Sequence, residues 1–281
     1  MMTIKSQDDL LQMYDGNKIC GIFPVMKNSQ IIFQGKNNLL FCESEVVLDD
    51  TTLKFLGDNS VIYLGTNRHD YRLFVSLRND SVFHMGKHNY IHQNLTIILS
   101  EQRHCFIGDY GLFSYNIWIR NSDTHIVYDC RTRMRRNPTK SVYIGDHVWL
   151  GQESMILKGT EIDSGSIVGA KALVTGKKIP SNTSWGGNPA RQIADEVFWD
   201  GAVVHEWTEE MTELGNFYDN YIAEYHKGYH VDGWIYNYEE SESIAYGKID
   251  RALNEAKSSQ KKLEYLQSLN SKKTKNRFVH H

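Results

Sequence analysis

The sequence has few cysteines, no long apolar run and no surplus of basic residues. Its four cysteines are scattered with no Cys-x-x-Cys pair, so neither a zinc site nor a disulfide framework is indicated. No run approaches the roughly 18 apolar residues that a membrane-spanning helix needs. The formal net charge of −3 argues against general nucleic-acid binding, which calls for a basic face. The first residues turn acidic where a signal peptide is apolar, so we expect a cytoplasmic protein.

The composition is that of a globular protein. The chain has 281 residues, of which 41% are hydrophobic and 23% are charged. These fractions exclude a disordered or collagen-like chain. A chain of this length buries enough surface to fold without disulfides or a structural metal.

A period of six residues runs through the second half of the chain. Aliphatic residues recur at every sixth position, and glycine directly follows three of them. This period is neither the 3.6 of a helix nor the two of a half-buried strand. It is typical of short parallel strands that are joined by turns and stacked as a solenoid with the aliphatic residues inside. The six positions are Ile144, Leu150, Ile156, Ile162, Val168 and Val174.

The same register is weaker upstream and is then interrupted. Between Ile119 and Ile144 it stops, and a polar, arginine-rich stretch intervenes. We expect a loop inserted near 121–142 that projects from the solenoid, because such loops commonly carry function. The weaker runs upstream are Met85, Ile91, Ile97 and then Ile107, Phe113, Ile119.

The composition changes after Pro189. Residues 195–248 are rich in acids and aromatics, and a helical pattern of apolar residues continues from Ile249. We therefore expect a solenoid domain over 1–193 and a C-terminal helical region over 194–281. Tryptophans of this region could stack on sugar rings, but we favour packing against the solenoid or between subunits. They are Trp199, Trp207 and Trp234.

Four segments then follow one another in order: Ile144–Gly151 (IGDHVWLG), Ile156–Gly159 (ILKG), Val168–Ala170 (VGA) and Gly186–Arg191 (GGNPAR). With the Asp-x-His of residues 123–125 upstream, they closely resemble the hexapeptide-repeat acyltransferases. Within that family the sequence is most similar to the bacterial O-acetyltransferases of capsular and other surface polysaccharides. The strong resemblance covers roughly residues 105–200, and the helical end is not a general feature of the family.

The resemblance implies a mainly β fold, a left-handed parallel β-helix with three strands per coil, here with a C-terminal helical extension. It also implies a homotrimer in which acetyl-CoA lies in the groove between neighbouring solenoids. Each active site would then draw residues from two chains and take a saccharide as acceptor. No metal is expected.

Acetyl transfer to a hydroxyl needs a base for the hydroxyl proton and donors for the oxyanion. His125 matches the family's catalytic histidine, and an imidazole titrates near the working pH. Asp123 could orient that imidazole, or it could cap the local turn. His147 is the competing base, but we interpret it as a solvated coil histidine or an acceptor contact. Because no Cys or Ser stands beside a base, we expect direct transfer without a covalent intermediate.

The remaining site residues are assigned by the resemblance. Trp149 matches a tryptophan that lines the donor and acceptor groove, with inter-coil or trimer packing as the alternative role. Backbone groups of three turn residues would contact the pantetheine arm, and a cation would lie near the nucleotide end. The arginines between 131 and 136 could bind an anion but are more typical of a solvated face. The turn residues are Gly151, Gly169 and Ala170, and the cations are Arg191 and Lys177. For Lys177, a solvated surface position without CoA contact is an equally good interpretation.

We therefore predict an acetyl-CoA-dependent O-acetyltransferase acting on hydroxyls of a bacterial surface saccharide. An amino-sugar N-acetyltransferase or a serine acetyltransferase remains open, as does a non-catalytic scaffold. A zinc enzyme similar to the γ-carbonic anhydrases is disfavoured, because that family separates two zinc ligands by four residues. Here His84, His88 and His92 are separated by three.

Overall fold

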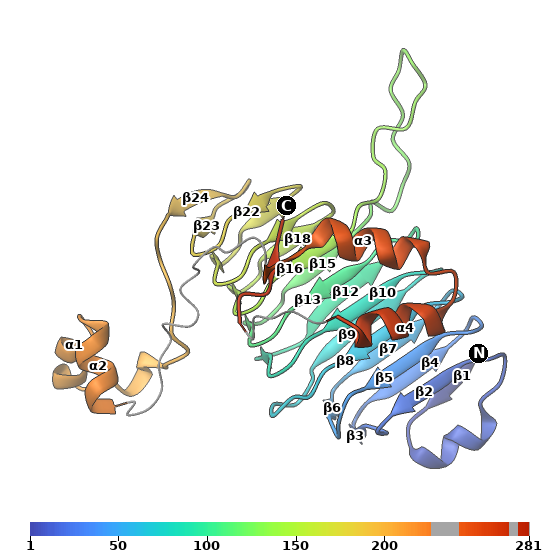
Figure 1. Ribbon diagram of the computed structural model, residues 1–281, viewed down its shortest axis with the longest axis horizontal. Helices are drawn as coiled ribbons and strands as arrows, with labels where there is room; N and C mark the ends of the chain where they lie inside the picture. Colours follow the sequence, from blue (N-terminus) through green and yellow to red (C-terminus); the bar gives the residue numbers. More distant parts are fainter. Residues whose placement is uncertain (226–241, 270–274, 281) are drawn as a thin grey trace.

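The computed structural model of the chain describes residues 1–225, 242–269 and 275–280. The chain winds into a three-sided solenoid, and each side is a sheet of short strands stacked along the long axis (Figure 1). One coil passes in turn through a strand of face 1, of face 2 and of face 3. We name the corners after the faces that they join: corner 1–2, corner 2–3 and corner 3–1.

The strands of each face are as follows. Face 1 carries β2 (Lys18–Gly21), β5 (Leu39–Cys42), β8 (Val61–Leu64), β10 (Val82–Met85), β13 (Cys105–Ile107), β16 (Val142–Ile144), β19 (Glu161–Ile162) and β22 (Lys178–Ile179). Face 2 carries the pair β3 (Val25–Lys27) and β6 (Val47–Asp49), then β11 (Tyr90–Ile91), β14 (Leu112–Phe113), β17 (Trp149–Leu150), β20 (Ile167–Val168), β23 (Ser184–Gly186) and β24 (Arg191–Ala194). Face 3 carries β1 (Met2–Ile4), β4 (Gln30–Phe33), β7 (Thr52–Phe55), β9 (Leu73–Leu77), β12 (Leu95–Leu99), β15 (Trp118–Arg120), β18 (Met155–Leu157) and β21 (Leu173–Thr175).

Neighbouring strands on the three faces pair in parallel except at the two ends. There β1 pairs antiparallel with β4, and β23 pairs antiparallel with β24. A 3₁₀ helix, η1 (Gln7–Gln12), follows β1.

The predicted six-residue register is confirmed by burial. All six aliphatic positions from Ile144 to Val174 are 0% exposed, and so are the positions of the two weaker upstream runs apart from Ile91 at 1%. These side chains form one continuous core inside the coils. The solenoid is therefore held together by stacked aliphatic residues, each in register with one in the next coil.

Coil length differs between the two halves of the solenoid. From Ile144 to Val174, consecutive core positions lie six residues apart through all three faces. In the coil from Met85 to Ile107, two steps are also of six residues, but the step from face 3 to face 1 is longer. Ile97, for example, is followed by Ile107. This ten-residue step explains why the period is weak upstream.

The inserted loop leaves the solenoid at corner 3–1, the corner where the upstream coils carry their extra residues. It projects far from the stack as a hairpin closed by a bridge between Tyr128 and Arg135 (Figure 1). Buried Asn121 anchors its start, accepting a hydrogen bond from Ser100 N–H and donating to the carbonyls of Ser100 and Arg103. The loop thus lies between the end of β15 at Arg120 and the start of β16 at Val142.

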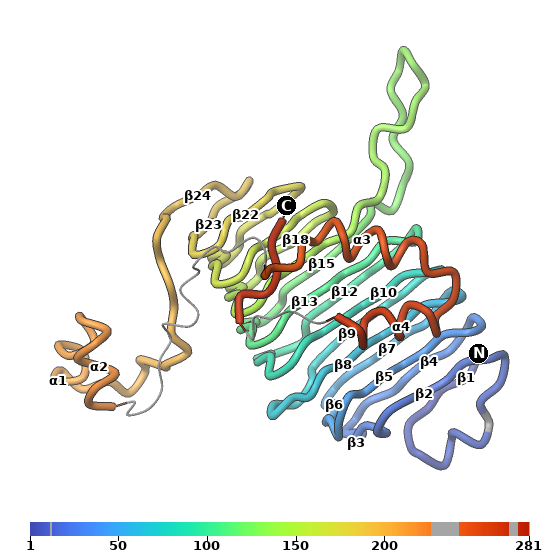
Figure 2. The backbone as a smooth tube through the Cα atoms, viewed as in Figure 1, coloured from blue at the N-terminus to red at the C-terminus, as the bar shows by residue number. Residues whose placement is uncertain are grey.

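After β24 the described residues form two groups of helices with different surroundings. η2 (Val204–Glu206), α1 (Glu209–Leu214) and α2 (Tyr218–Tyr225) stand apart from the solenoid (Figure 1). β25 (Ile244–Ala245), α3 (Tyr246–Glu255), α4 (Ser259–Gln267) and β26 (Phe278–Val279) return along face 1, as the tube view shows (Figure 2). Trp234 lies outside the described residues.

The returning segment covers face 1 with a second apolar core. Outward-facing side chains of face 1, such as Val61, Val82 and Phe106, pack against Ile249 and Leu263. No helix among the described residues is long and apolar enough to cross a bilayer.

Polar contacts add to this packing. Tyr246 Oη donates to the Ile162 carbonyl at 2.7 Å, and buried Lys262 Nζ donates to the carbonyls of Asn59 and Asp80 at 2.9 and 3.0 Å. Face 1 is therefore occupied by the chain itself.

Candidate active site

One buried amide holds the base of the inserted loop. Asn137 Nδ2 donates to Asp123 Oδ2 and to the carbonyl of His125, both at 2.8 Å. Its Oδ1 accepts from the N–H of Val127, also at 2.8 Å. The amide is thus satisfied at both ends, which fixes the backbone on both sides of His125. We call this arrangement the Asn137 clamp.

Asp123 belongs to the same network. Its carboxylate accepts hydrogen bonds from Lys158 Nζ and from Asn137. These bonds, Lys158 first, hold the pKa of Asp123 below its ordinary value, so the group is ionised at neutral pH. Within the described residues the carboxylate bonds these two groups and not the imidazole of His125. In a single chain, Asp123 therefore braces the loop.

His125 is exposed at corner 3–1, at the start of the projecting hairpin. Beyond it, several large apolar side chains of the loop are also exposed, an arrangement that favours contact with another surface. Arginines near the tip are partly paired: Arg135 makes two 2.9 Å hydrogen bonds to Glu101, and Arg136 lies 3.8 Å from Asp129. The exposed apolar residues are Ile126, Val127, Tyr128 and Met134.

His147 has a different environment, at corner 1–2. Its side chain is 4% exposed, and its ring stacks on Trp199 with centroids 3.9 Å apart. Trp199 Nε1 also donates to the carbonyl of His147 at 3.1 Å. Burial lowers the pKa of His147 to about 3, so its imidazole is a weak proton acceptor at neutral pH. This environment suits a contact residue better than a base.

Trp149 lies on the outer side of face 2, in β17, and its side chain is 39% exposed. Its ring centroid lies 6.0 Å from that of Trp199. Trp199 comes from the segment after β24, so this segment returns to corner 1–2 and packs there. One tryptophan of the C-terminal region therefore packs against the solenoid, as expected.

The candidate donor-binding turns lie at corner 2–3. A Cβ on Gly151 would come within 2.6 Å of Ala170 N, so close packing of two coils requires glycine there. The N–H groups of Gly151 and Gly169 already donate to carbonyls of the next coil. Ala170 is exposed, and its N–H has no acceptor among the described residues, which leaves it available to a ligand.

The two candidate cations are far apart along the fold. Arg191 is exposed on β24, at the end of face 2, close to corner 2–3. Lys177 lies in the turn between β21 and β22, which is at corner 3–1. A single chain therefore distributes the candidate residues over all three corners and brings His125 close to neither Trp149 nor the donor-binding turns.

A pocket of about 390 Å³ lies at corner 1–2, beside His147 and Trp199. We call it the aromatic pocket. It lies between the upstream coils, which contribute imidazole and phenol rings, and the segment after β24. Its volume is within the roughly 300–1,000 Å³ of small-ligand sites. The side chains that define it are Arg68, His69, His88, Tyr90, Tyr110 and Trp199.

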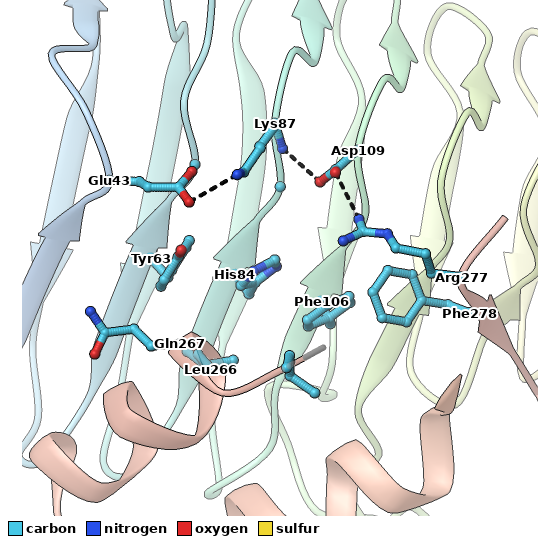
Figure 3. A pocket seen from close by; sticks show the side chains of 13 residues that line it. Glu43, Tyr63, His84, Lys87, Phe106, Asp109, Leu266, Gln267, Arg277 and Phe278 are labelled. Atoms are coloured by element: carbon cyan, nitrogen blue, oxygen red, sulfur yellow. Dashed lines mark hydrogen bonds and ion pairs between the residues drawn. The ribbon is translucent and has the colours of Figure 1, made fainter. Parts of the chain in front are cut away.

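A second cavity, of about 360 Å³, lies on face 1 beside the end of α4 (Figure 3). The rings of Tyr63, His84 and Phe106 form a stack along its floor, with centroids 4.7 and 4.1 Å apart. Its charged groups are mutually paired: Lys87 Nζ lies 3.0 Å from Glu43, and Arg277 lies 2.9 Å from Asp109 and 2.7 Å from Asp146. Because these charged groups are paired with one another, they are less available to bind a charged ligand.

The histidines considered for zinc do not converge. His84 lies on face 1, His88 at corner 1–2, and His92 directly after β11 on face 2. Among the residues that the structure describes, no group of three His, Cys, Asp or Glu side chains is placed to hold a metal ion.

Comparison with known proteins identifies the relatives of this fold. No protein-family model matches the sequence. The chain is 26% identical over 190 residues to polysialic acid O-acetyltransferase of Neisseria meningitidis, covering 68% of this chain and 88% of that enzyme. It is 35% identical over 118 residues to galactoside O-acetyltransferase of Lactococcus lactis, covering 41% of this chain and 55% of that enzyme.

A solved structure agrees. The polySia-specific acetyltransferase NeuO superposes with a TM-score of 0.62 at 25% identity, covering 73% of this chain and 91% of the other. The chain is thus similar in sequence and in fold to acetyltransferases of the hexapeptide-repeat family. The solenoid of this acyltransferase is accordingly a left-handed parallel β-helix, as the resemblance implied.

Sequence reasoning missed two residues that support the candidate site. Asn137 bonds to residues 10 to 14 positions away along the loop, and only its place at the loop's end hinted at a role. Lys158 stands within a motif that carries the resemblance, yet its ion pair with Asp123 spans 35 residues. The aromatic pocket was also missed, because its rings come from successive coils.

Proposed function

We propose that this acyltransferase is an acetyl-CoA-dependent O-acetyltransferase that modifies hydroxyls of a bacterial surface saccharide in the cytoplasm. One observation carries the proposal: the alignment with polysialic acid O-acetyltransferase covers 88% of that enzyme. The galactoside O-acetyltransferase supports the same chemistry on a second saccharide. The exposed His125 on its clamped loop is available to an acceptor hydroxyl.

In this proposal His125 takes the proton of the acceptor hydroxyl as its oxygen attacks the thioester carbon. The new C–O bond forms, the C–S bond breaks, and the proton passes on to the leaving thiolate. The Asn137 clamp and Asp123 hold the histidine's backbone in place, which preserves the attack geometry. The free N–H of Ala170 and the exposed indole of Trp149 support donor binding in the groove beside them.

Direct transfer is supported by the state of the buried thiols. Burial raises the pKa of Cys42 to about 12 and raises that of Cys105 further, so both remain protonated and unreactive. Of the other two cysteines, Cys130 is exposed on the inserted loop and Cys20 is half-buried. No Cys therefore combines a nucleophilic setting with an adjacent base.

We further propose that the working unit is a cyclic homotrimer with its sites between subunits. Within one chain, His125 at corner 3–1 is separated from Trp149 by β16 and the turn that follows it. The exposed apolar side chains of the inserted loop would be covered by a neighbouring solenoid. Face 1 is occupied by α3 and α4, which leaves faces 2 and 3 for subunit contacts.

The test of the reaction is thiol release from acetyl-CoA with a panel of polysaccharides, amino sugars and serine. We expect release only with polysaccharides, and His125→Ala should lower the rate by ~10²–10⁴-fold while CoA binding persists. His147→Ala is the matched control and should affect the KM for the acceptor more than kcat. Full activity in His125→Ala would contradict the assignment of the base. Absence of CoA binding by the wild type would contradict the transferase proposal.

The test of the shared site is subunit mixing. His125→Ala and Trp149→Ala chains are co-expressed in equal amounts and purified as mixed trimers. If one subunit supplies His125 and its neighbour supplies Trp149, about a quarter of the sites regain both residues in a cyclic trimer. Mixing His125→Ala with the double variant is the control and should restore nothing. No recovery in the first mixture would place both residues in one chain's site.

A further inference from the structure

The aromatic pocket has an unbalanced charge, unlike the cavity on face 1. None of its lining residues is acidic. Among the described residues the guanidinium of Arg68 meets no carboxylate, and its recorded polar contact is from Nε to Nε2 of His69 at 3.2 Å. The nearby carboxylate of Asp70 is paired with Lys27 at 3.1 Å. An exposed arginine is therefore left without a counter-charge at the mouth of the pocket.

The walls of the pocket are flat rings with polar edges. Tyr90 packs edge-on against His69 with centroids 5.1 Å apart, and its exposed fraction is 38%. Burial, and then the charge of Arg68, lower the pKa values of His69 and His88, so both imidazoles are neutral at neutral pH. Neutral imidazoles and phenols donate and accept hydrogen bonds, and their faces accept the apolar side of a sugar ring.

The pocket is also continuous with the proposed reaction centre. Trp199 closes it on one side, and the Trp199 ring lies 6.0 Å from Trp149, which lines the proposed groove. A polymer seated in the pocket would therefore extend past Trp149. The cavity on face 1 and the three cavities beside Asp49, Asp80 and Ser181 do not combine an unpaired cation, ring walls and this proximity to Trp149 among the described residues.

We propose that the aromatic pocket binds an acidic sugar unit of the acceptor, with Arg68 on its carboxylate and the surrounding rings against its body. This proposal rests on the proposed function and names the acceptor class as a carboxylate-bearing polysaccharide. A guanidinium suits a carboxylate because its planar fork can donate two parallel hydrogen bonds. The unit bound here lies beside the unit that is acetylated, so the pocket sets the register of the polymer.

The experiment measures binding and turnover separately. Polysialic acid and polygalacturonic acid are each titrated into the full-length protein by calorimetry, alongside their carboxyl-reduced forms. We expect wild type to bind at least one acidic polymer and to bind its reduced form at least tenfold more weakly, because a charge-assisted hydrogen bond is lost. Arg68→Ala should raise the KM for that polymer by about tenfold or more and leave the KM for acetyl-CoA unchanged. Arg68→Lys should be intermediate.

Lys27→Ala is the matched control, since it removes a nearby exposed cation that already has a partner. It should leave the affinity for the polymer close to wild type. Binding of neither acidic polymer, or equal binding of acidic and reduced forms, would overturn the proposal. A rise in the KM for acetyl-CoA in Arg68→Ala would also overturn it, because the anion would then be a CoA phosphate. Arg68-dependent binding without thiol release would support the pocket while refuting the proposed function.

Discussion

The upstream and downstream coils enclose the same core with turns of different length. After the inserted loop, the coil from Ile144 to Ile162 advances by six, six and six residues, whereas before it the coil from Met85 to Ile107 advances by six, six and ten. The steps from face 1 to face 2 and from face 2 to face 3 are the same in the coils around the insertion. Corner 3–1 alone absorbs the variation there, and the inserted loop with His125 leaves from that corner. In these coils the variation in length is thus confined to one corner, and the core continues past the inserted loop in register.

The comparison also shows how the two halves divide the proposed functions. The upstream coils supply Arg68, His69 and Tyr90 to the aromatic pocket, and the downstream coils supply Trp149 and the turns at corner 2–3. The returning C-terminal segment connects the halves, because α4 is anchored on upstream turns and α3 on downstream strands. In these proposals, the pocket for the acceptor and the turns for the donor lie on adjoining parts of one stack of coils.

If the two halves share one core, the same truncation of a core residue in either half should lower the free energy of unfolding by the same amount. Ile97 and Ile156 occupy the same core position of face 3, connected in register through Ile119. We expect Ile97→Ala and Ile156→Ala each to lower the free energy of unfolding by about 2–5 kcal/mol. Chemical denaturation followed by circular dichroism measures the loss. The matching Ile→Val changes should cost only about 0.5–1.5 kcal/mol, and separate transitions for the two halves would contradict a single core.

The anchoring of α4 can be removed without changing the solenoid. Lys262 is 1% exposed and donates to two backbone carbonyls and to Asp80 Oδ1. Lys262→Met keeps the length of the side chain but leaves these acceptors unpaired, so we expect a loss of about 2–3 kcal/mol. Lys261→Met, an exposed neighbour on α4, is the control and should have little effect. Equal stability of both variants would show that packing alone holds α4 on face 1.

Each half also contains a buried histidine that makes stability depend on pH. Burial lowers the pKa of His84, in the upstream coils, and of His147, downstream, to about 3. The unfolded chain then binds protons that the folded chain does not, so stability falls as pH drops from about 6.5 to about 3. His84→Phe should reduce that slope by up to about 1.4 kcal/mol per pH unit. Unfolding by urea at several pH values measures it, and an unchanged slope would refute the neutral buried state.

Much of the solenoid could be predicted, because its period is a local property of the sequence. Ile144 and its successors follow at fixed steps, so their burial needed no knowledge of other coils. The upstream coils were harder, since the ten-residue step after Ile97 hides the repeat. The sequence also indicates that face 1 is covered. The strands β8 (VIYL) and β10 (VFHM) are apolar or aromatic without alternation, which is typical of strands buried on both sides.

Of the candidate site, the sequence predicted only those features that a single residue or a local break in the repeat reveals. The broken register located the loop that carries His125, but the Asn137 clamp depends on hydrogen bonds across that loop. The aromatic pocket depends on rings from successive coils, such as Tyr90 and Tyr110, and on Trp199 returning from beyond β24. These contacts join residues that are distant in the sequence, so they depend on how the coils are aligned with one another. The sequence of a single coil does not show that alignment.

The smallest expected effect concerns the ion pair between an upstream turn and the closing bridge of the hairpin in the inserted loop. Glu101 belongs to the long step of an upstream coil, and it accepts two hydrogen bonds from Arg135. Arg135→Ala should leave the melting temperature unchanged, because an exposed ion pair contributes little to global stability. Hydrogen exchange at residues 128–135 should nevertheless become faster, while exchange at the Val127 N–H, which the Asn137 clamp holds, stays slow. Arg131→Ala, at the exposed tip, is the control. Faster exchange at the Val127 N–H in Arg135→Ala would mean that the upstream turn, and not the clamp alone, positions the loop that carries the proposed base.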